Sequence, residues 1–155
     1  MMPRAPTSKG AGRRPIRLHK QLLLPLPDEC VRELSLANHL ALVGCGPSAG
    51  SRHAVNNLIR VTYLSFFLWE AGYGDVNAEF YVSAERVLDQ VVVRAEQTEL
   101  WCLDIEEVPV MQKVLRIHDR QISDAPTRAF LEAKARLESV LRKEHTVSPI
   151  AKRLR

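Results

Sequence analysis

Apolar residues recur at helical spacing in five segments of the chain. The spacing predicts helices over about 28–43, 52–71, 77–99, 108–122 and 127–143. The third segment has the clearest period, since Phe80, Ala84, Leu88 and Val91 face one way and charged residues face the other. No window shows the apolar alternation bounded by turns that a β-hairpin needs. The pattern predicts an all-α fold, a compact antiparallel bundle of about five helices.

The first of these segments, 28–43, is apolar on two sides. One stripe consists of Val31, Leu34, Ala37, Ala41 and Leu42. A second stripe consists of Leu36, Leu40 and Val43. A helix at the surface of a globular protein normally has a single apolar stripe, which faces the core. We therefore expect this helix either to be sandwiched between neighbours or to contribute to an oligomer interface.

Residues typical of helix ends separate the five segments. Asp28 and Ser51 are suitable N-caps for the first and second helices. Asp104, followed three residues later by Glu107, matches a capping box before the fourth helix. Asp124 and Pro126 are expected to open the last helix. The joints are short, which indicates antiparallel neighbours.

Proline divides the chain into a helical middle and a different N-terminal segment. Residues 1–27 contain prolines at positions 3, 6, 15, 25 and 27, which lack the amide donor that a helix or sheet needs. We expect a disordered, extended arm over 1–27, a helical domain over 28–145 and a short basic tail over 146–155.

The net charge of +4 belongs to the two ends. The ends contain nine basic residues and no acid: Arg4, Lys9, Arg13, Arg14, Arg17, Lys20, Lys152, Arg153 and Arg155. Without these nine, 13 of the 22 basic residues remain against 18 acidic ones, so the middle of the chain has a net charge of −5. An acidic body repels phosphate, so we expect contacts with nucleic acid or an acidic partner at these nine residues.

Cysteine usage and hydropathy indicate a cytoplasmic protein. Cys30, Cys45 and Cys102 are an odd number at wide spacing, which is typical of reduced thiols. The longest apolar run, Val61–Trp69, is well short of the ~20 residues that span a bilayer. The start of the chain lacks the apolar stretch of a signal peptide, because Pro25 and Pro27 interrupt its leucines. We expect neither a membrane contact nor a cofactor.

The sharpest candidate for enzymatic chemistry is the pair His118 and Asp119. Adjacent His and Asp on a helix occur in an all-α class of metal-dependent phosphohydrolases, which also needs a separate upstream His and a downstream Asp. His39 or His53 can supply the first, but Asp124 is too near in sequence to come from another helix. The set is incomplete, so we expect no catalytic residue and no metal site, with His39, His118 and Asp119 as weak candidates.

Residues from about Leu34 to Leu141 resemble a group of small bacterial all-helical proteins, some of which are labelled regulators of the Fis type, after the factor for inversion stimulation. The resemblance lies in three stretches: 38–42, the apolar helix around Tyr63, and 115–119. It implies a regulatory role and no established active residues. True Fis proteins end in a helix-turn-helix, whereas the last helix here lacks the turn glycine. No glycine of the chain has an alanine four residues before it, as that motif commonly requires.

We therefore expect a non-enzymatic helical interaction or regulatory module that self-associates or binds a protein partner. The alternative is a DNA-associated transcriptional regulator that binds phosphates through its basic tails. The third hypothesis is a metal-dependent hydrolase that uses His118 and Asp119.

Overall fold

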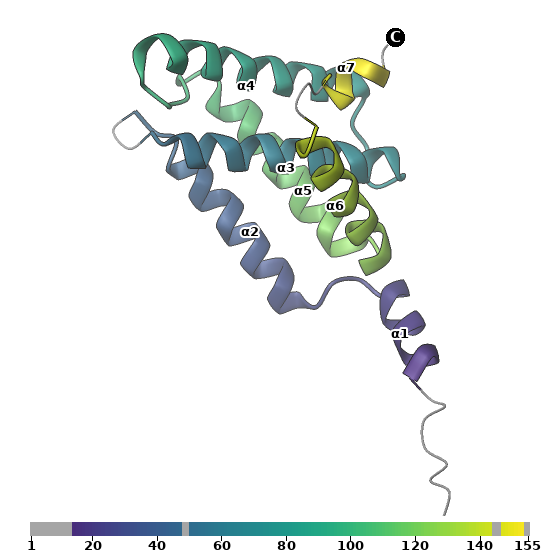
Figure 1. Cartoon of the computed structure of the whole chain (residues 1–155). Helices are drawn as coiled ribbons and strands as arrows, with labels where there is room; N and C mark the ends of the chain where they lie inside the picture. The colour runs from purple at the N-terminus through teal and green to yellow at the C-terminus, as the bar shows by residue number, and fades with distance from the viewer. Residues whose placement is uncertain (1–13, 48–49, 144–146, 154–155) are drawn as a thin grey trace, which may run out of the picture.

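The structure is a computed structural model that describes residues 14–47, 50–143 and 147–153. Within these ranges the chain forms helices and no named strand, as Figure 1 shows. The helices are α1 (Arg14–Leu23), α2 (Asp28–Val43), α3 (Arg52–Glu70), α4 (Ala78–Thr98), α5 (Val108–Asp124), α6 (Thr127–Leu141) and α7 (Pro149–Arg153). The predicted all-α bundle is confirmed, and all five predicted helices are present.

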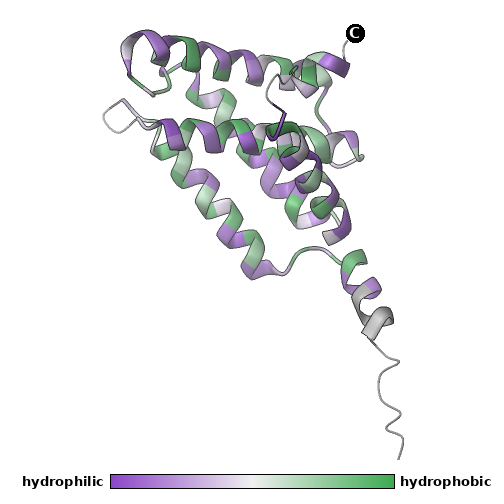
Figure 2. Cartoon of the chain, viewed as in Figure 1, coloured by the Kyte–Doolittle hydropathy of each residue, from purple (hydrophilic) through white to green (hydrophobic). Residues whose placement is uncertain are grey.

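Helix α3 is the centre of the bundle. It packs against α2, α4, α5, α6 and α7, and nine of its 19 residues are buried. Figure 1 shows α4 on one side of α3 and α2 and α6 on the other, while α5 crosses α3. Hydrophilic and hydrophobic residues are mixed along the helices (Figure 2), and in the described part of the chain no helix is long and apolar enough to cross a bilayer.

The predicted side-chain cap at Ser51 is confirmed. The Ser51 hydroxyl accepts a hydrogen bond from the Ala54 amide at 3.1 Å. The Glu107 carboxylate accepts one from the Asp104 amide at 2.7 Å, which is one half of the predicted capping box, but the N-cap residue of α5 is Glu107 and not Asp104. The assignment of Asp28 as an N-cap is wrong, because Pro27 is the N-cap residue and Asp28 is the first residue of α2. There its charge still suits the positive end of the helix dipole.

The last helix, α6, begins at Thr127, and its N-cap residue is Pro126 rather than Asp124. Asp124 is the final residue of α5, and Pro126 is the N-cap residue of α6. Ala125 between them has an extended backbone, with φ −72° and ψ 140°, which ends α5. The expectation that Asp124 opens the last helix is therefore wrong, whereas Pro126 lies at that end as expected.

The N-terminal segment was expected to be extended, but the structure places α1 inside it. Pro15 lies in the first turn of α1, where the missing amide donor has no partner to lose, and the next proline is Pro25. After α1, the Leu24 carbonyl accepts hydrogen bonds from the Thr127 amide at 2.7 Å and the Thr127 hydroxyl at 2.8 Å. Residues 24–27 are thus tied to the start of α6, while residues 1–13 lie outside the described part.

The C-terminal tail also packs on the bundle. Ile150 in α7 is only 1% exposed and joins the core around α3 and α6. The Arg153 guanidinium donates to the Glu70 carboxylate at 2.6 Å and lies 5.0 Å from the centre of the Trp69 ring. The end of the chain therefore belongs to the folded domain up to Arg153.

A polar network lies inside the core between α3, α4 and α5. The Gln121 amide donates to the Ser65 carbonyl at 3.0 Å and to the Tyr73 carbonyl at 2.8 Å. The Ser65 hydroxyl donates to the Gln121 side-chain oxygen at 2.7 Å and lies 2.9 Å from the Tyr81 hydroxyl. Ser65, Tyr81 and Gln121 are each at most 2% exposed. Buried polar groups of this kind are stable only when they are paired, so the network fixes the relative positions of the three helices.

Candidate interaction surface

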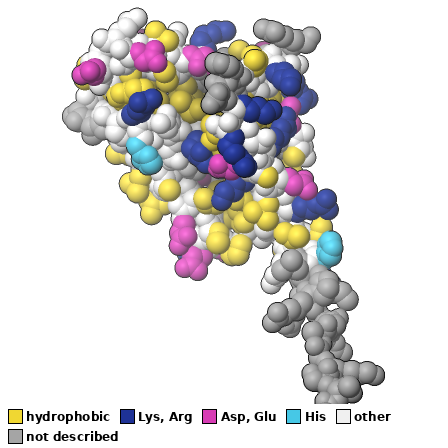
Figure 3. All heavy atoms as spheres, viewed as in Figure 1, with side chains coloured by type: hydrophobic (Ala, Val, Ile, Leu, Met, Phe, Trp, Pro, Cys, Tyr) yellow, Lys and Arg dark blue, Asp and Glu magenta, His cyan; other side chains and the backbone are white. Residues whose placement is uncertain are grey.

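Helix α2 has an apolar side that no other described part of the chain covers. Leu36, Leu40 and Val43 are 61%, 58% and 73% exposed, and we call these three residues the outer face of α2. Their spacing of four and three residues places them in one row along the helix. Figure 3 shows hydrophobic side chains along the free edge of the molecule where α2 runs.

The opposite side of α2 packs on the bundle. Leu34 and Leu42 are half-buried, Asn38 is buried, and the helix contacts α3 and α5. The sequence left open whether α2 is sandwiched or contributes to an interface. Sandwiching is excluded for the described chain, since only one of its two apolar stripes is covered.

Contacts in its middle and at its C-terminal end hold α2 in place. In its middle, the His39 imidazole bonds to the Asp119 carboxylate of α5 at 2.9 Å. At its C-terminal end, a Cβ at Gly44 would lie 3.4 Å from the Ala54 Cβ, so α2 and the start of α3 touch. The outer face is therefore presented by a fixed helix rather than by a loop.

The two ends of the outer face differ in charge. The first six residues of α2 contain three exposed acids and one arginine: Asp28, Glu29, Glu33 and Arg32. At the other end, α3 begins beside the end of α2 with the exposed residues Arg52 and His53. The Arg52 guanidinium also lies 5.4 Å from the centre of the Trp101 ring. An acidic end and an apolar middle thus follow one another along α2, and the basic start of α3 lies beside the C-terminal end of α2.

The described candidates His39, His53 and His118 do not come together in a group of metal ligands. His118 is 1% exposed, and its Nδ1 has no hydrogen-bond partner. Burial lowers its pKa to about 4, although Asp119 and Gln121 act in the opposite direction. Asp119, the next residue, points elsewhere because successive residues on a helix are about 100° apart, and it bonds to His39. Of the three weak metal candidates, the structure brings His39 and Asp119 together and leaves His118 in the core.

Across the described ranges, no group of three or more His, Cys, Asp and Glu side chains could hold a metal ion. His53, the other histidine considered as an upstream ligand, is exposed at the start of α3.

The basic residues predicted to contact phosphate differ in exposure and in their ion pairs. Arg4, Lys9, Arg13 and Arg155 lie outside the described residues. Arg14 and Arg17 belong to α1, and Lys20 and Lys152 are exposed. Arg153 is bound to Glu70, which also binds Arg136 of α6 at 2.6 Å. Arg153 was predicted to contact a partner, but the tail folds back as α7 and Arg153 pairs with Glu70. A partner that binds Arg153 would have to replace this ion pair.

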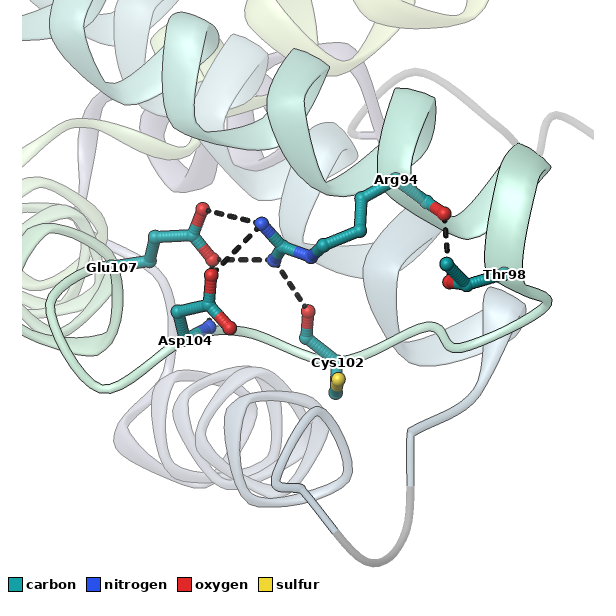
Figure 4. A network of polar contacts seen from close by, with 5 residues as sticks. All are labelled: Arg94, Thr98, Cys102, Asp104 and Glu107. Atoms are coloured by element: carbon teal, nitrogen blue, oxygen red, sulfur yellow. Dashed lines mark hydrogen bonds and ion pairs between the residues drawn. The ribbon is translucent and has the colours of Figure 1, made fainter.

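Arg94 organises the loop between α4 and α5, as Figure 4 shows. Its guanidinium donates to the Glu107 carboxylate at 2.8 Å and to the Cys102 carbonyl at 3.0 Å, and it pairs with Asp104 at 3.0 Å. Burial opposes ionisation of Glu107, but the hydrogen bonds from Arg94 and the Asp104 amide outweigh it and lower the Glu107 pKa. Two carboxylates and one backbone carbonyl engage the guanidinium, so the network ties this loop to α4. The sequence predicted an interaction between Asp104 and Glu107, but it did not predict that Arg94 binds both.

A cavity of about 420 Å³ lies beside the turn between α3 and α4. Its polar lining includes Asp75, Arg120, Gln121 and Asp124. The Gln121 amide already gives both of its hydrogens to the Ser65 and Tyr73 carbonyls. The Gln121 side chain therefore has no free donor that a ligand in the cavity could use. The cavity is not a candidate for the functional site.

Comparison with known proteins gives no relative: no family model, no curated protein and no solved structure matches the chain. The resemblance to proteins labelled as Fis-type therefore stays a prediction.

Proposed function

We propose that the protein is a non-enzymatic helical interaction module that self-associates through the outer face of α2. The observation that carries the proposal is the exposure of Leu36, Leu40 and Val43, at 61%, 58% and 73%, on a helix whose other side is packed. Rows of exposed apolar residues on a fixed helix are typical of interaction surfaces.

The distribution of charge favours a second copy of the chain as the partner. Two α2 helices can pair antiparallel about a two-fold axis so that Leu36 of each copy meets Leu40 of the other. The axis then passes near residue 38, ten residues from Asp28, and a helix rises about 1.5 Å per residue, so Asp28 lies about 15 Å from the axis. Val43 lies only about 7.5 Å from it, so the acidic end extends past the end of the opposing α2.

The acidic end of each copy then lies over the start of the other copy's α3. That start carries Arg52 and His53 and the positive end of the α3 dipole. The same surface is therefore complementary to itself, as an isologous dimer requires. An antiparallel pairing combines apolar contact in the middle with opposite charges at both ends.

The size of the outer face sets the strength that we expect. Full burial of a Leu or Val side chain contributes roughly 1.5 to 3 kcal/mol, and each of these residues is already partly covered, so about 1 to 2 kcal/mol remains for each. An interface of only a few partly covered apolar side chains is small, and association must also offset the loss of translational and rotational freedom. We therefore expect a reversible dimer whose population depends on concentration.

Light scattering on the full chain across concentrations tests this proposal. Between about 1 and 500 μM, the range in which a reversible dimer forms and dissociates, we expect the mean mass to rise from 17.5 kDa toward twice that value. Added salt should shift the curve to higher concentration, because the charges at both ends of the interface are exposed and screened. A mass that stays at 17.5 kDa over the whole range would contradict self-association.

We also propose that the protein acts in the cytoplasm. Cys30, Cys45 and Cys102 are all free thiols, and the cytoplasm keeps thiols reduced.

A further inference from the structure

Two loops that are far apart in the sequence lie against each other at one end of the bundle. The Leu103 amide donates to the Cys45 carbonyl at 2.8 Å, which joins the loop after α2 to the loop between α4 and α5. A Cβ at Gly50 would lie 2.2 Å from the Trp101 carbonyl oxygen. The two loops thus touch through their backbones at two places.

Cys45 and Cys102 lie on these two loops at the point of contact. The Cys45 carbonyl oxygen is about 2.4 Å from the Cys45 Cα, and the Leu103 nitrogen is about 2.4 Å from the Cys102 Cα. With the 2.8 Å hydrogen bond between them, the two Cα atoms are at most about 7.6 Å apart. Disulfides usually join Cα atoms that are about 4.4 to 6.8 Å apart. The upper limit only slightly exceeds the range that a disulfide spans.

The two thiols share one site but differ in access to solvent. Cys45 is 0% exposed, whereas Cys102 is partly exposed. Figure 4 shows the Cys102 side chain pointing away from Arg94, which binds only the Cys102 carbonyl. Burial raises the pKa of Cys45 to about 11, and the charge of Cys102 adds to this increase. The electrostatic effect of one thiol on the other is a second sign that they are neighbours.

We propose that Cys45 and Cys102 form an intramolecular disulfide when the protein meets a low-molecular-weight disulfide such as oxidised glutathione. The Cys102 thiolate attacks one sulfur of the small disulfide, forms a mixed disulfide and releases one small thiolate. Cys45 then loses its proton to solvent and attacks the Cys102 sulfur, which releases the second small thiolate. The protein loses two electrons and two protons, and the small disulfide is reduced to two thiols.

The order of the two steps follows from exposure. Of the two cysteines, Cys102 is the one that can meet the reagent, and Cys45 is placed to resolve the mixed disulfide. Because the attacking form is the thiolate, the second step should accelerate about tenfold for each pH unit between about 7 and 9. The inference does not depend on the proposed function, although Cys45 follows Val43 by two residues and the crosslink would fix the end of the outer face.

The test uses the full chain with Cys30→Ser, which removes the exposed third thiol and leaves the pair intact. The folded protein is incubated with oxidised glutathione, remaining thiols are alkylated, and the protein is digested with trypsin without reduction. The cysteines fall in different tryptic peptides, 33–52 for Cys45 and 95–113 for Cys102. We expect peptide 33–52 linked to peptide 95–113 and an intact mass lower by two hydrogen atoms.

Two results would overturn the inference. One is a stable glutathione adduct on Cys102 with Cys45 alkylated after unfolding, because Cys45 would then be out of reach. The other is complete lack of reaction at both cysteines. A Cys45→Ser variant in the same background serves as a reference for the trapped mixed disulfide, and the test stands without it if that variant fails to fold.

Discussion

Replacing Gln121 with leucine is expected to lower the free energy of unfolding by about 2 to 3 kcal/mol, since each buried polar group left without a partner costs about 1 to 3 kcal/mol. Gln121 is 2% exposed and bonds to Ser65 and to the Tyr73 carbonyl. Leucine has a similar volume but offers neither a donor nor an acceptor. The Tyr73 carbonyl and the Ser65 hydroxyl therefore each lose a hydrogen-bond partner.

Urea unfolding followed by circular dichroism measures this effect. Gln112→Leu is the matched control, because Gln112 is an exposed residue of the same helix and should change stability by no more than about 0.5 kcal/mol. Adding Ser65→Ala to Gln121→Leu should cost less than the sum of the two single changes, since the second change removes a group that has already lost its bond to Gln121. Equal stability of the Gln121→Leu and Gln112→Leu variants would show that the network contributes nothing.

The second large effect is a loss of stability as pH falls, caused by His118. Burial lowers its pKa to about 4, whereas an unfolded histidine titrates near 6.5. Between these values the unfolded chain binds a proton that the folded chain does not, so acidification favours unfolding. We expect a loss of about 1.4 kcal/mol for each pH unit between about 6.5 and 4, and no contribution from this group above about 7.

Urea unfolding of the wild type and a His118→Leu variant at several pH values isolates this contribution. The variant should lose the pH dependence between about 6.5 and 5, while the carboxylates, which titrate lower, remain as a shared background. His53→Leu is the matched control because His53 is exposed, and it should keep the wild-type slope. The assignment fails if His118→Leu and the wild type show the same slope.

The helices were predictable where a cap or a clear apolar stripe marks them. Ser51 is a cap and the segment that begins near Asn77 has the clearest stripe, and α3 and α4 begin within a residue of the expected positions. Helices α1 and α7 were missed for a different reason. The prolines around α1 conceal a ten-residue stretch that can be helical after its first turn, and the five-residue α7 contributes a single buried residue, Ile150.

The candidate site could be predicted only in part. The sequence shows two apolar stripes on 28–43, but their residues are too alike in hydropathy to tell which stripe faces inward. That choice is made by α3 and α5, through contacts between residues distant in the sequence. The His39–Asp119 bond joins residues 80 positions apart, and the Ser65–Gln121 bond joins residues 56 apart. Neither pairing follows from local spacing.

The most direct test of the central claim compares two variants that each gain one charge. One change lies on the proposed interface and the other lies on an exposed surface of another helix. Leu40→Glu places a carboxylate in the middle of the outer face of α2, and Val93→Glu places one on α4, where Val93 is 54% exposed. Circular dichroism should show that both variants are folded, since both positions face solvent. In sedimentation equilibrium we expect Leu40→Glu to remain monomeric at concentrations at which the wild type and Val93→Glu dimerise. Dimerisation of Leu40→Glu with the affinity of the wild type would show that the outer face of α2 is not the interface.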